Sequence, residues 1–144
     1  MDEVDRKLLE ELRRDSRTPV TVLSRRLGVP RVTIQYRLRR LQASGAIVRF
    51  TVLVDRQLEG KGITAFTLVN LISGSVDQRV VGKAIARVPG VVEVHDITGR
   101  PDFIVKLRIA SISELGDRAN RIRRTPGVGN TETLTCVQTY KEEF

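Results

Sequence analysis

Two five-residue segments of nearly the same sequence occur in the second half of the chain and constrain its fold more than any other feature. Arg87-Val-Pro-Gly-Val and Arg124-Thr-Pro-Gly-Val each follow a stretch with helical spacing of apolar residues. Proline stops a helix, glycine lets the chain turn, and valine favours the start of a strand. The sequence therefore predicts two equivalent helix-to-strand junctions.

The elements around these junctions follow an order typical of a ferredoxin-like α+β domain. Strands are expected at residues 64–72, 91–98, 102–110 and 130–141, and helices at 77–88 and 113–124. The order βαββαβ places both helices on one face of the sheet. The first strand is apolar on both faces, with Phe66 and Leu68 on one and Ala65 and Val69 on the other. We therefore expect a second copy of the chain to cover the open face.

Residues 1–56 are predicted to form a helical domain, joined by a linker at 57–63 to the domain at 64–144. Apolar residues at helical spacing predict helices over 2–15, 20–27 and 31–44. Only Gly28, Val29 and Pro30 separate the second helix from the third, which is typical of a helix-turn-helix. The alternating apolar run at 46–54 predicts a strand, or wing, after the third helix.

The charge of the chain is concentrated in the helical domain. From Ser16 to Val54 the sequence has eight arginines and no aspartate, glutamate or lysine. Of the formal net charge of +8, +6 belongs to residues 1–56 and +2 to residues 57–144. Arginine offers a planar fork of donors that fits phosphate oxygens and the edge of guanine. Double-stranded DNA is the expected partner, although basic surfaces also meet anionic membranes or keep a protein soluble.

The third helix carries most of the candidate DNA contacts. Ile34, Leu38 and Leu41 share the face toward the other two helices, which leaves the opposite face for DNA. The side chains there that suit base edges or phosphates are Arg31, Thr33, Gln35, Tyr36, Arg39 and Arg40. Arg25 and Arg26, on the second helix, are expected to anchor the DNA backbone. For Arg37, an ion pair with an acid of the first helix and a phosphate contact are equally compatible with its position.

Several other classes of protein receive no support from the sequence. There is no glycine-rich phosphate loop, nucleophile elbow or metal-ligand spacing, so we expect no enzyme, no cofactor and no metal. Cys136 is the only cysteine, and no apolar run approaches the roughly 20 residues that span a bilayer. These observations predict a cytoplasmic protein without a membrane partner.

Two alternatives to sequence-specific DNA binding stay open at this point. RNA-binding modules share the βαββαβ order, but the strand at 102–110 offers only Phe103 as a stacking aromatic. A chromatin-like protein that binds DNA without sequence preference would also explain the basic helical domain.

Taken together, the sequence resembles the Lrp/AsnC family of transcriptional regulators, also called feast/famine regulatory proteins, over essentially the whole chain. The resemblance rests on Met1-Asp-Glu-Val-Asp-Arg-Lys-Leu-Leu, Leu23-Ser-Arg-Arg-Leu-Gly-Val, Thr33-Ile-Gln-Tyr-Arg-Leu-Arg-Arg-Leu and Ser44-Gly-Ala-Ile-Val, and later on Pro89-Gly-Val-Val-Glu-Val and Gly99-Arg-Pro-Asp-Phe-Ile-Val. It implies a DNA-binding regulator whose C-terminal domains form homodimers, often assembled into octamers. It also implies a small-molecule effector, usually an amino acid.

The resemblance further nominates effector-binding residues, because in the family the effector sits near a Gly-x-x-Asp hairpin and the early part of the last strand. Carried over, these are Gly99, Arg100, Asp102, Thr131 and Thr133. Two positions depart from the family pattern. Pro30 replaces the serine that usually caps the recognition helix, so that cap must be weaker or made differently. Arg100 stands where an acid is common, which favours an acidic or uncharged effector over a basic one, with no effector at all as the alternative.

Overall fold

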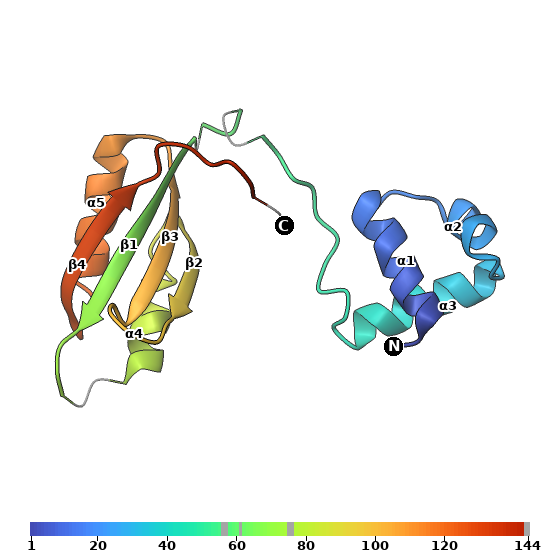
Figure 1. Ribbon diagram of the computed structural model, residues 1–144, viewed down its shortest axis with the longest axis horizontal. Helices are drawn as coiled ribbons and strands as arrows, with labels where there is room; N and C mark the ends of the chain where they lie inside the picture. Colours follow the sequence, from blue (N-terminus) through green and yellow to red (C-terminus); the bar gives the residue numbers. More distant parts are fainter. Residues whose placement is uncertain (56–57, 61, 75–76, 143–144) are drawn as a thin grey trace. The chain divides into compact units, whose positions relative to one another are not determined.

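A computed structural model describes residues 1–55, 58–60, 62–74 and 77–142 (Figure 1). The chain divides into two compact units, Met1–Leu53 and Val54–Phe144, and each is described by itself. The linker expected at 57–63 includes Gln57 and Lys61, which lie outside the described residues.

The N-terminal unit contains the three predicted helices: α1 (Glu3–Arg14), α2 (Val20–Leu27) and α3 (Arg31–Ala43). Their core consists of Leu8 from α1, Leu23 from α2, and Ile34 and Leu41 from α3, all nearly or fully buried. The apolar faces read from the sequence therefore point inward, which confirms the helix-turn-helix organisation.

The ends of these helices are fixed by local chemistry. Asp2 caps α1 through a reciprocal capping box, in which its side chain accepts from the Asp5 backbone N–H and Asp5 accepts from that of Asp2. Gly28 ends α2 in the left-handed conformation, with φ of 66°. Pro30 precedes α3 and provides no side-chain cap, as its departure from the family pattern predicted.

The strand predicted at 46–54 is absent from the structure, and its absence has a physical reason. A strand needs a neighbour to accept and donate its backbone hydrogen bonds. Residues 46–54 form no ladder with any described part of the chain. The side chains of Val48 and Val52 are 87% and 77% exposed. The alternating pattern is present, but no described segment of this chain pairs with it.

The C-terminal unit has the predicted βαββαβ order. Its elements are β1 (Ile63–Leu71), α4 (Gln78–Ile85), β2 (Val91–Asp96), β3 (Phe103–Ile109), α5 (Ile112–Arg123) and β4 (Val128–Thr135). The strands form one antiparallel sheet in the order β2-β3-β1-β4, which is the ferredoxin-like arrangement. Both helices lie against the same face (Figure 1).

The two faces of the sheet differ in burial. Ala65 and Val69 of β1 and Val105 and Leu107 of β3 are fully buried beneath the helices, together with Ile85, Ile122 and other helical residues. The alternate residues of the same strands, including Phe66 and Leu68, are only half-buried and lie on the open face. The expectation of one covered and one uncovered face is confirmed.

The repeated Pro-Gly-Val junctions behave as predicted. Gly90 and Gly127 have φ of 87° and 94°, a conformation that residues with a side chain rarely adopt, and β2 and β4 begin at the valine that follows each. At Gly90 an added Cβ would also lie 3.2 Å from the backbone oxygen of Arg108. Glycine is thus required at this junction for both conformation and space.

Strand β4 is shorter than the expected 130–141. It pairs only with β1, and Thr135 lies opposite Ala65, close to the residue where β1 begins. The Cys136 N–H still donates to the Thr64 carbonyl at 2.8 Å, after which β1 offers no further backbone partner. The chain then leaves the sheet as a C-terminal tail, defined here as residues 137–142.

Candidate functional site

The outward face of α3 presents most of the predicted DNA contacts to solvent. Four of them are exposed, with Tyr36 at 58%: Arg31, Gln35, Tyr36 and Arg39. Thr33 is half-buried at the flank. Val32 also lies on this face at 74% exposure. The face therefore combines guanidinium, amide, phenol and methyl groups, the set that reads base edges and phosphates in a DNA groove.

Arg37 points the other way, into an ion cluster with α1. Its Nη1 lies 2.5 Å from Oδ2 of Asp2 and 2.7 Å from Oδ1 of Asp5. Arg40 donates to the second oxygen of Asp5, whose side chain is fully buried. Of the two interpretations of Arg37, the structure supports the ion pair with the first helix.

The cluster keeps both carboxylates charged. The hydrogen bond from Arg37 is the main reason why the pKa of Asp2 falls to about 2. Burial alone would raise the pKa of Asp5, but the hydrogen bonds from Arg37 and the Asp2 backbone, with the charge of Arg40, outweigh burial and lower it. The acids of α1 thus neutralise part of the arginine stretch that has no acids of its own.

The arginines predicted to meet DNA consequently divide into two groups. Arg26 is paired with Glu11, with Nη1 and Oε2 2.5 Å apart, and Arg40 is paired with Asp5. Arg25, Arg31 and Arg39 are exposed and form no ion pair within the described part of the chain. The sequence predicted DNA contacts for all five arginines. It did not reveal which of them form ion pairs with acidic residues of α1.

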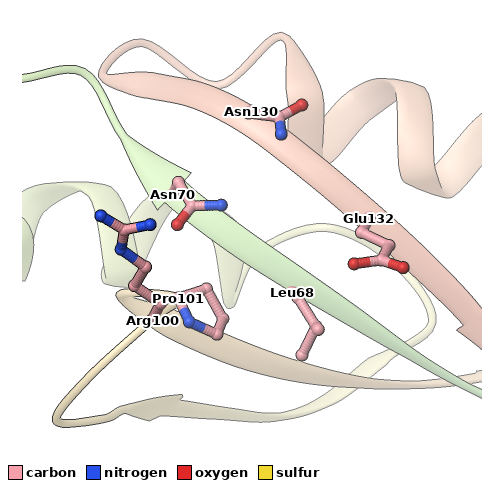
Figure 2. A pocket seen from close by; sticks show the side chains of 6 residues that line it. All are labelled: Leu68, Asn70, Arg100, Pro101, Asn130 and Glu132. Atoms are coloured by element: carbon pink, nitrogen blue, oxygen red, sulfur yellow. The ribbon is translucent and has the colours of Figure 1, made fainter.

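A pocket of about 380 Å³ opens on the uncovered face of the sheet (Figure 2). Its walls come from β1, the β2–β3 hairpin and β4, and the lining residues are Leu68, Asn70, Arg100, Pro101, Asn130 and Glu132. In Figure 2 the Arg100 guanidinium lies beside Asn70, whereas the Glu132 carboxylate lies at the other end, beyond Leu68. The pocket thus offers a cation, an anion, two amides and an apolar floor.

The structure distributes the five nominated effector residues differently from the expectation. Thr131 lies opposite Val69 and Thr133 opposite Thr67, so both face the helices, and the hydroxyls of Thr133 and Thr67 are 2.9 Å apart. Asn130 and Glu132, their neighbours on β4, line the pocket instead. Asn130 and Glu132 could have been identified only from the register between β1 and β4, which shows which alternate residues of β4 share the open face with Leu68.

The three nominated residues of the β2–β3 hairpin, Gly99, Arg100 and Asp102, have different roles in the structure. Arg100 lines the pocket. Asp102 does not, because its Oδ2 accepts the Leu71 backbone N–H at 2.7 Å while its own N–H donates to the Val69 carbonyl at 2.9 Å. Gly99 turns the chain with φ of 113°. Asp102 therefore fastens the hairpin to the end of β1 and holds Arg100 in place.

Charged residues at the other end of the open face meet the C-terminal tail. Glu142 accepts from Arg108 and, at 2.5 Å, from Nζ of Lys106, which also lies 3.0 Å from Oε1 of Glu93. The side chains of Lys106 and Arg108 are only 14% and 10% exposed. The hydrogen bond to Glu142 is the main reason why the pKa of Lys106 rises, and Lys106 lowers the pKa of Glu93. These cations are thus neutralised on a face that carries Phe66 and Ile104 nearby.

The described residues contain no metal site and no membrane-spanning helix, and Phe103 provides no surface for stacking RNA bases on the open face. Within them, no group of three or more His, Cys, Asp or Glu side chains is placed to hold a metal ion. Among the same residues, no helix is long and apolar enough to cross a membrane. Phe103 is buried beneath the helices at 3% exposure, so it provides no stacking platform for RNA bases on the open face.

Two protein-family models match the chain, one for each unit. Residues 1–42 match the AsnC-type helix-turn-helix domain, and residues 64–144 match the Lrp/AsnC ligand binding domain.

Individual proteins agree with the family models. An uncharacterized HTH-type transcriptional regulator of Pyrococcus horikoshii is 41% identical, over 100% of this chain and 97% of the relative. The structure of E. coli AsnC has a TM-score of 0.91 at 25% identity and covers 100% of this chain and 97% of its own. A feast or famine regulatory protein from M. tuberculosis, complexed with L-methionine, has a TM-score of 0.90 at 25% identity, with 99% and 95% coverage.

Proposed function

The chain belongs to the Lrp/AsnC family of transcriptional regulators, and we propose that it binds specific DNA sequences through α3 under the control of an uncharged amino acid. The family fixes the class of protein. The exposed side chains of α3 and the lining of the pocket support the finer proposal.

The observation that carries the DNA proposal is the division among the arginines. Arg37 and Arg40 hold α3 against α1 by way of Asp5. Arg31 and Arg39 are left exposed beside Gln35, on the face of α3 away from the core. A rigid helix that carries free guanidinium and amide groups is what direct recognition of base edges requires.

The test is a selection of bound sequences from a random DNA pool, followed by variants on the selected site. We expect Arg39→Ala or Gln35→Ala to cost about 1 to 3 kcal/mol at one base pair and to relax selectivity there. Arg13→Ala, at an exposed position on α1, is the matched control and should leave selectivity unchanged. If no preferred sequence emerges, the chromatin-like alternative replaces this proposal.

Arg25 is proposed to act differently, as an anchor for the DNA backbone. A phosphate contact positions the protein without specifying a base. Arg25→Ala should therefore weaken binding to all sequences alike and reduce the salt dependence of binding by about one unit of slope. A change in base preference would contradict this role.

The effector proposal rests on the opposite charges in the pocket. Arg100 can donate to an α-carboxylate and Glu132 can accept from an α-ammonium, while Leu68 and Pro101 offer apolar surface to a side chain. The charges of Arg100 and Glu132 match the carboxylate and the ammonium of an amino acid. A charged side chain on the ligand would have no opposite charge among the lining residues. An uncharged amino acid fits best, and the complex of the M. tuberculosis relative with L-methionine supports this class.

Calorimetry of the intact protein against the twenty amino acids tests the proposal. We expect heat from one or a few uncharged amino acids, and weaker binding by about tenfold or more in Arg100→Gln and in Glu132→Gln. Thr131→Val, on the opposite face of the same strand, is the control and should bind normally. No heat from any amino acid, with the protein folded, would rule out this effector class.

We also propose that the open face of the sheet joins two copies into a dimer. Phe66, Leu68 and Ile104 form an apolar surface there, and Leu134 is 46% exposed on the same face. Leu134→Asp should lower the mass measured by light scattering from dimer to monomer, because it would bury a charge in the interface. A monomeric mass for the unmodified chain at micromolar concentration would contradict the proposal.

A further inference from the structure

The two helices of the C-terminal unit carry an excess of positive charge that the rest of the unit lacks. Residues 77–90 and 111–126, which contain α4 and α5, hold seven Lys/Arg against three Asp/Glu. The remaining positions of 57–144 hold five against seven. The helix-covered side of this unit is therefore basic, although the unit as a whole is nearly balanced.

Three of these cations form a row along α4. Arg79, Lys83 and Arg87 recur every fourth residue and are all exposed. At about 100° per residue they lie on the side of the helix away from Val81 and Ile85, which pack in the core. The row therefore faces solvent along the whole length of α4 and into the turn that follows.

Among the described residues the row has no ion pair, in contrast to several cations elsewhere in the molecule. Arg37, Arg40, Lys106, Arg108 and Arg118 all have a carboxylate partner. Arg79, Lys83 and Arg87 make no ion pair with any described residue. Asp77, the nearest acid in sequence, uses its side chain to cap α4 by accepting the Arg79 backbone N–H at 2.9 Å. Carboxylates thus neutralise the half-buried cations Arg37, Lys106, Arg108 and Arg118, whereas no described carboxylate pairs with this exposed row.

The end of α5 adds further positive charge to the same side of the sheet. Arg121, Arg123 and Arg124 are exposed. Among the described residues, the one side-chain partner that these three guanidinium groups have is the neutral amide of Asn120, which accepts from Arg123. Asp117 is the one acid exposed near the middle of α5. The balance on the helical surface therefore stays positive.

The spacing of the α4 row suits a phosphate backbone. Residues four apart on a helix rise by about 6 Å, so the three cations span about 12 Å. Phosphates of one DNA strand advance about 3.4 Å along the duplex axis, so such a row can meet about three of them. No aromatic or amide groups in the row add base recognition, so contact would be independent of sequence.

We propose that the solvent face of α4 and α5 is a second DNA-binding surface, which contacts phosphates of the same duplex that the N-terminal units hold. The proposal rests on DNA binding by α3. A duplex held at one site is present at high effective concentration near the rest of the protein, so even three phosphate contacts add affinity. The surface would therefore act on long DNA and contribute little on a fragment that covers only the recognised site.

The test measures the salt dependence of binding by the full chain on two duplexes. One is a fragment of about 20 base pairs that covers only the selected site, and the other carries the same site within about 80 base pairs. The variant is Arg79→Gln, Lys83→Gln and Arg87→Gln together. We expect its slope of log K against log salt to be smaller by about two to three units on the long duplex, and unchanged on the short one.

The control removes the same charge from the exposed side of α1, with Arg6→Gln, Lys7→Gln and Arg13→Gln, and should leave the difference between long and short duplexes intact. Light scattering and circular dichroism check that mass and fold are retained. If the α4 variant misfolds, Arg121→Gln with Arg124→Gln provides the same test on α5.

Each result is decisive. Equal slopes for the variant and the unmodified chain on the long duplex would overturn the proposal, as would an equal loss on both duplexes. A loss of oligomeric mass would show that the helices meet another copy instead of DNA. If the unmodified chain binds neither duplex, the proposed DNA function fails first, and this surface fails with it.

Discussion

At the scale of single residues, Asp5 connects two helices of the N-terminal unit. Its fully buried carboxylate accepts from Arg37 and Arg40 and also closes the capping box with Asp2. One side chain thereby starts α1 and fixes α3 against it. The proposed DNA contacts on the outer face of α3 are held in position from the opposite side of the helix.

Asp5→Ala should destabilise the N-terminal unit by about 3 kcal/mol or more, because it removes one of the two carboxylates that pair with half-buried Arg37, the carboxylate that pairs with Arg40, and part of the helix cap. Glu10→Ala is the matched control, since Glu10 is an exposed acid on the same helix, and should change stability by less than about 0.5 kcal/mol. Urea unfolding followed by circular dichroism measures both. Similar midpoints for the two variants would refute the role of Asp5.

The lowered pKa of Asp2 predicts an acid-sensitive contact. Its pKa is about 2 in the folded chain against an ordinary value of 3.8, so between these values the unfolded state binds more protons. The contribution of Asp2 to stability is thus complete above pH 3.8 and is lost as the pH falls toward about 2. Asp2→Asn should flatten this part of the curve of unfolding free energy against pH. An unaltered curve would show that Arg37 does not hold Asp2 in solution.

At the scale of elements, junction glycines and helix glycines should respond in opposite ways. Gly90→Ala forces a side chain into a φ of 87° with the Arg108 carbonyl 3.2 Å away, so we expect a loss of about 1 kcal/mol or more. Gly116→Ala lies inside α5 with nothing within 4 Å, so it should gain about 0.5 to 1 kcal/mol. Thermal unfolding of the pair is the measurement, and a shift in the same direction for both would contradict this account.

The sequence predicted most elements because their signals are local. Apolar spacing fixed the three helices near the N-terminus, and the two Pro-Gly-Val junctions fixed the starts of β2 and β4. The prediction of a strand at 46–54 was wrong because strand pairing is not local. The alternating apolar pattern is in the sequence, but no described strand pairs with it. The length of β4 was wrong for the same reason, since β1 decides where pairing ends.

The candidate site was only partly predictable. Arg100, nominated through the hairpin motif, lines the pocket. Asn130 and Glu132 line it too but were not nominated, because the register between β1 and β4 decides which alternate residues share a face. Likewise, an ion pair between Arg40 and Asp5 depends on how α1 crosses α3, which spacing along the chain does not reveal.

At the scale of the whole molecule, charge is arranged by face. In the C-terminal unit, the row Arg79, Lys83 and Arg87 on the helical side makes no ion pair with a described residue. On the open face, Lys106 and Arg108 are neutralised by Glu93 and by Glu142 of the tail. An apolar face with neutralised charges suits contact with another copy of the chain. A face with free cations suits a polyanion.

Glu142→Gln should therefore weaken the proposed dimer, because Lys106 and Arg108 would then be buried in the interface with less compensation. We expect the dimer dissociation constant to rise by about tenfold or more, measured by sedimentation at several protein concentrations. Asp117→Asn, which removes one negative charge from the helical side, is the control and should leave it unchanged. No difference between the two would indicate that the open face is not the interface.

The alternation along β4 has a consequence for how the proposed effector preference of this protein can change. Asn130 and Glu132 line the pocket, while Thr131 and Thr133, one position away, support the core. In the proposed effector site, substitutions at every second position of this strand would change which ligand binds, while the intervening positions keep the core packed. Under this proposal, ligand preference and architecture depend on interleaved, separable sets of positions.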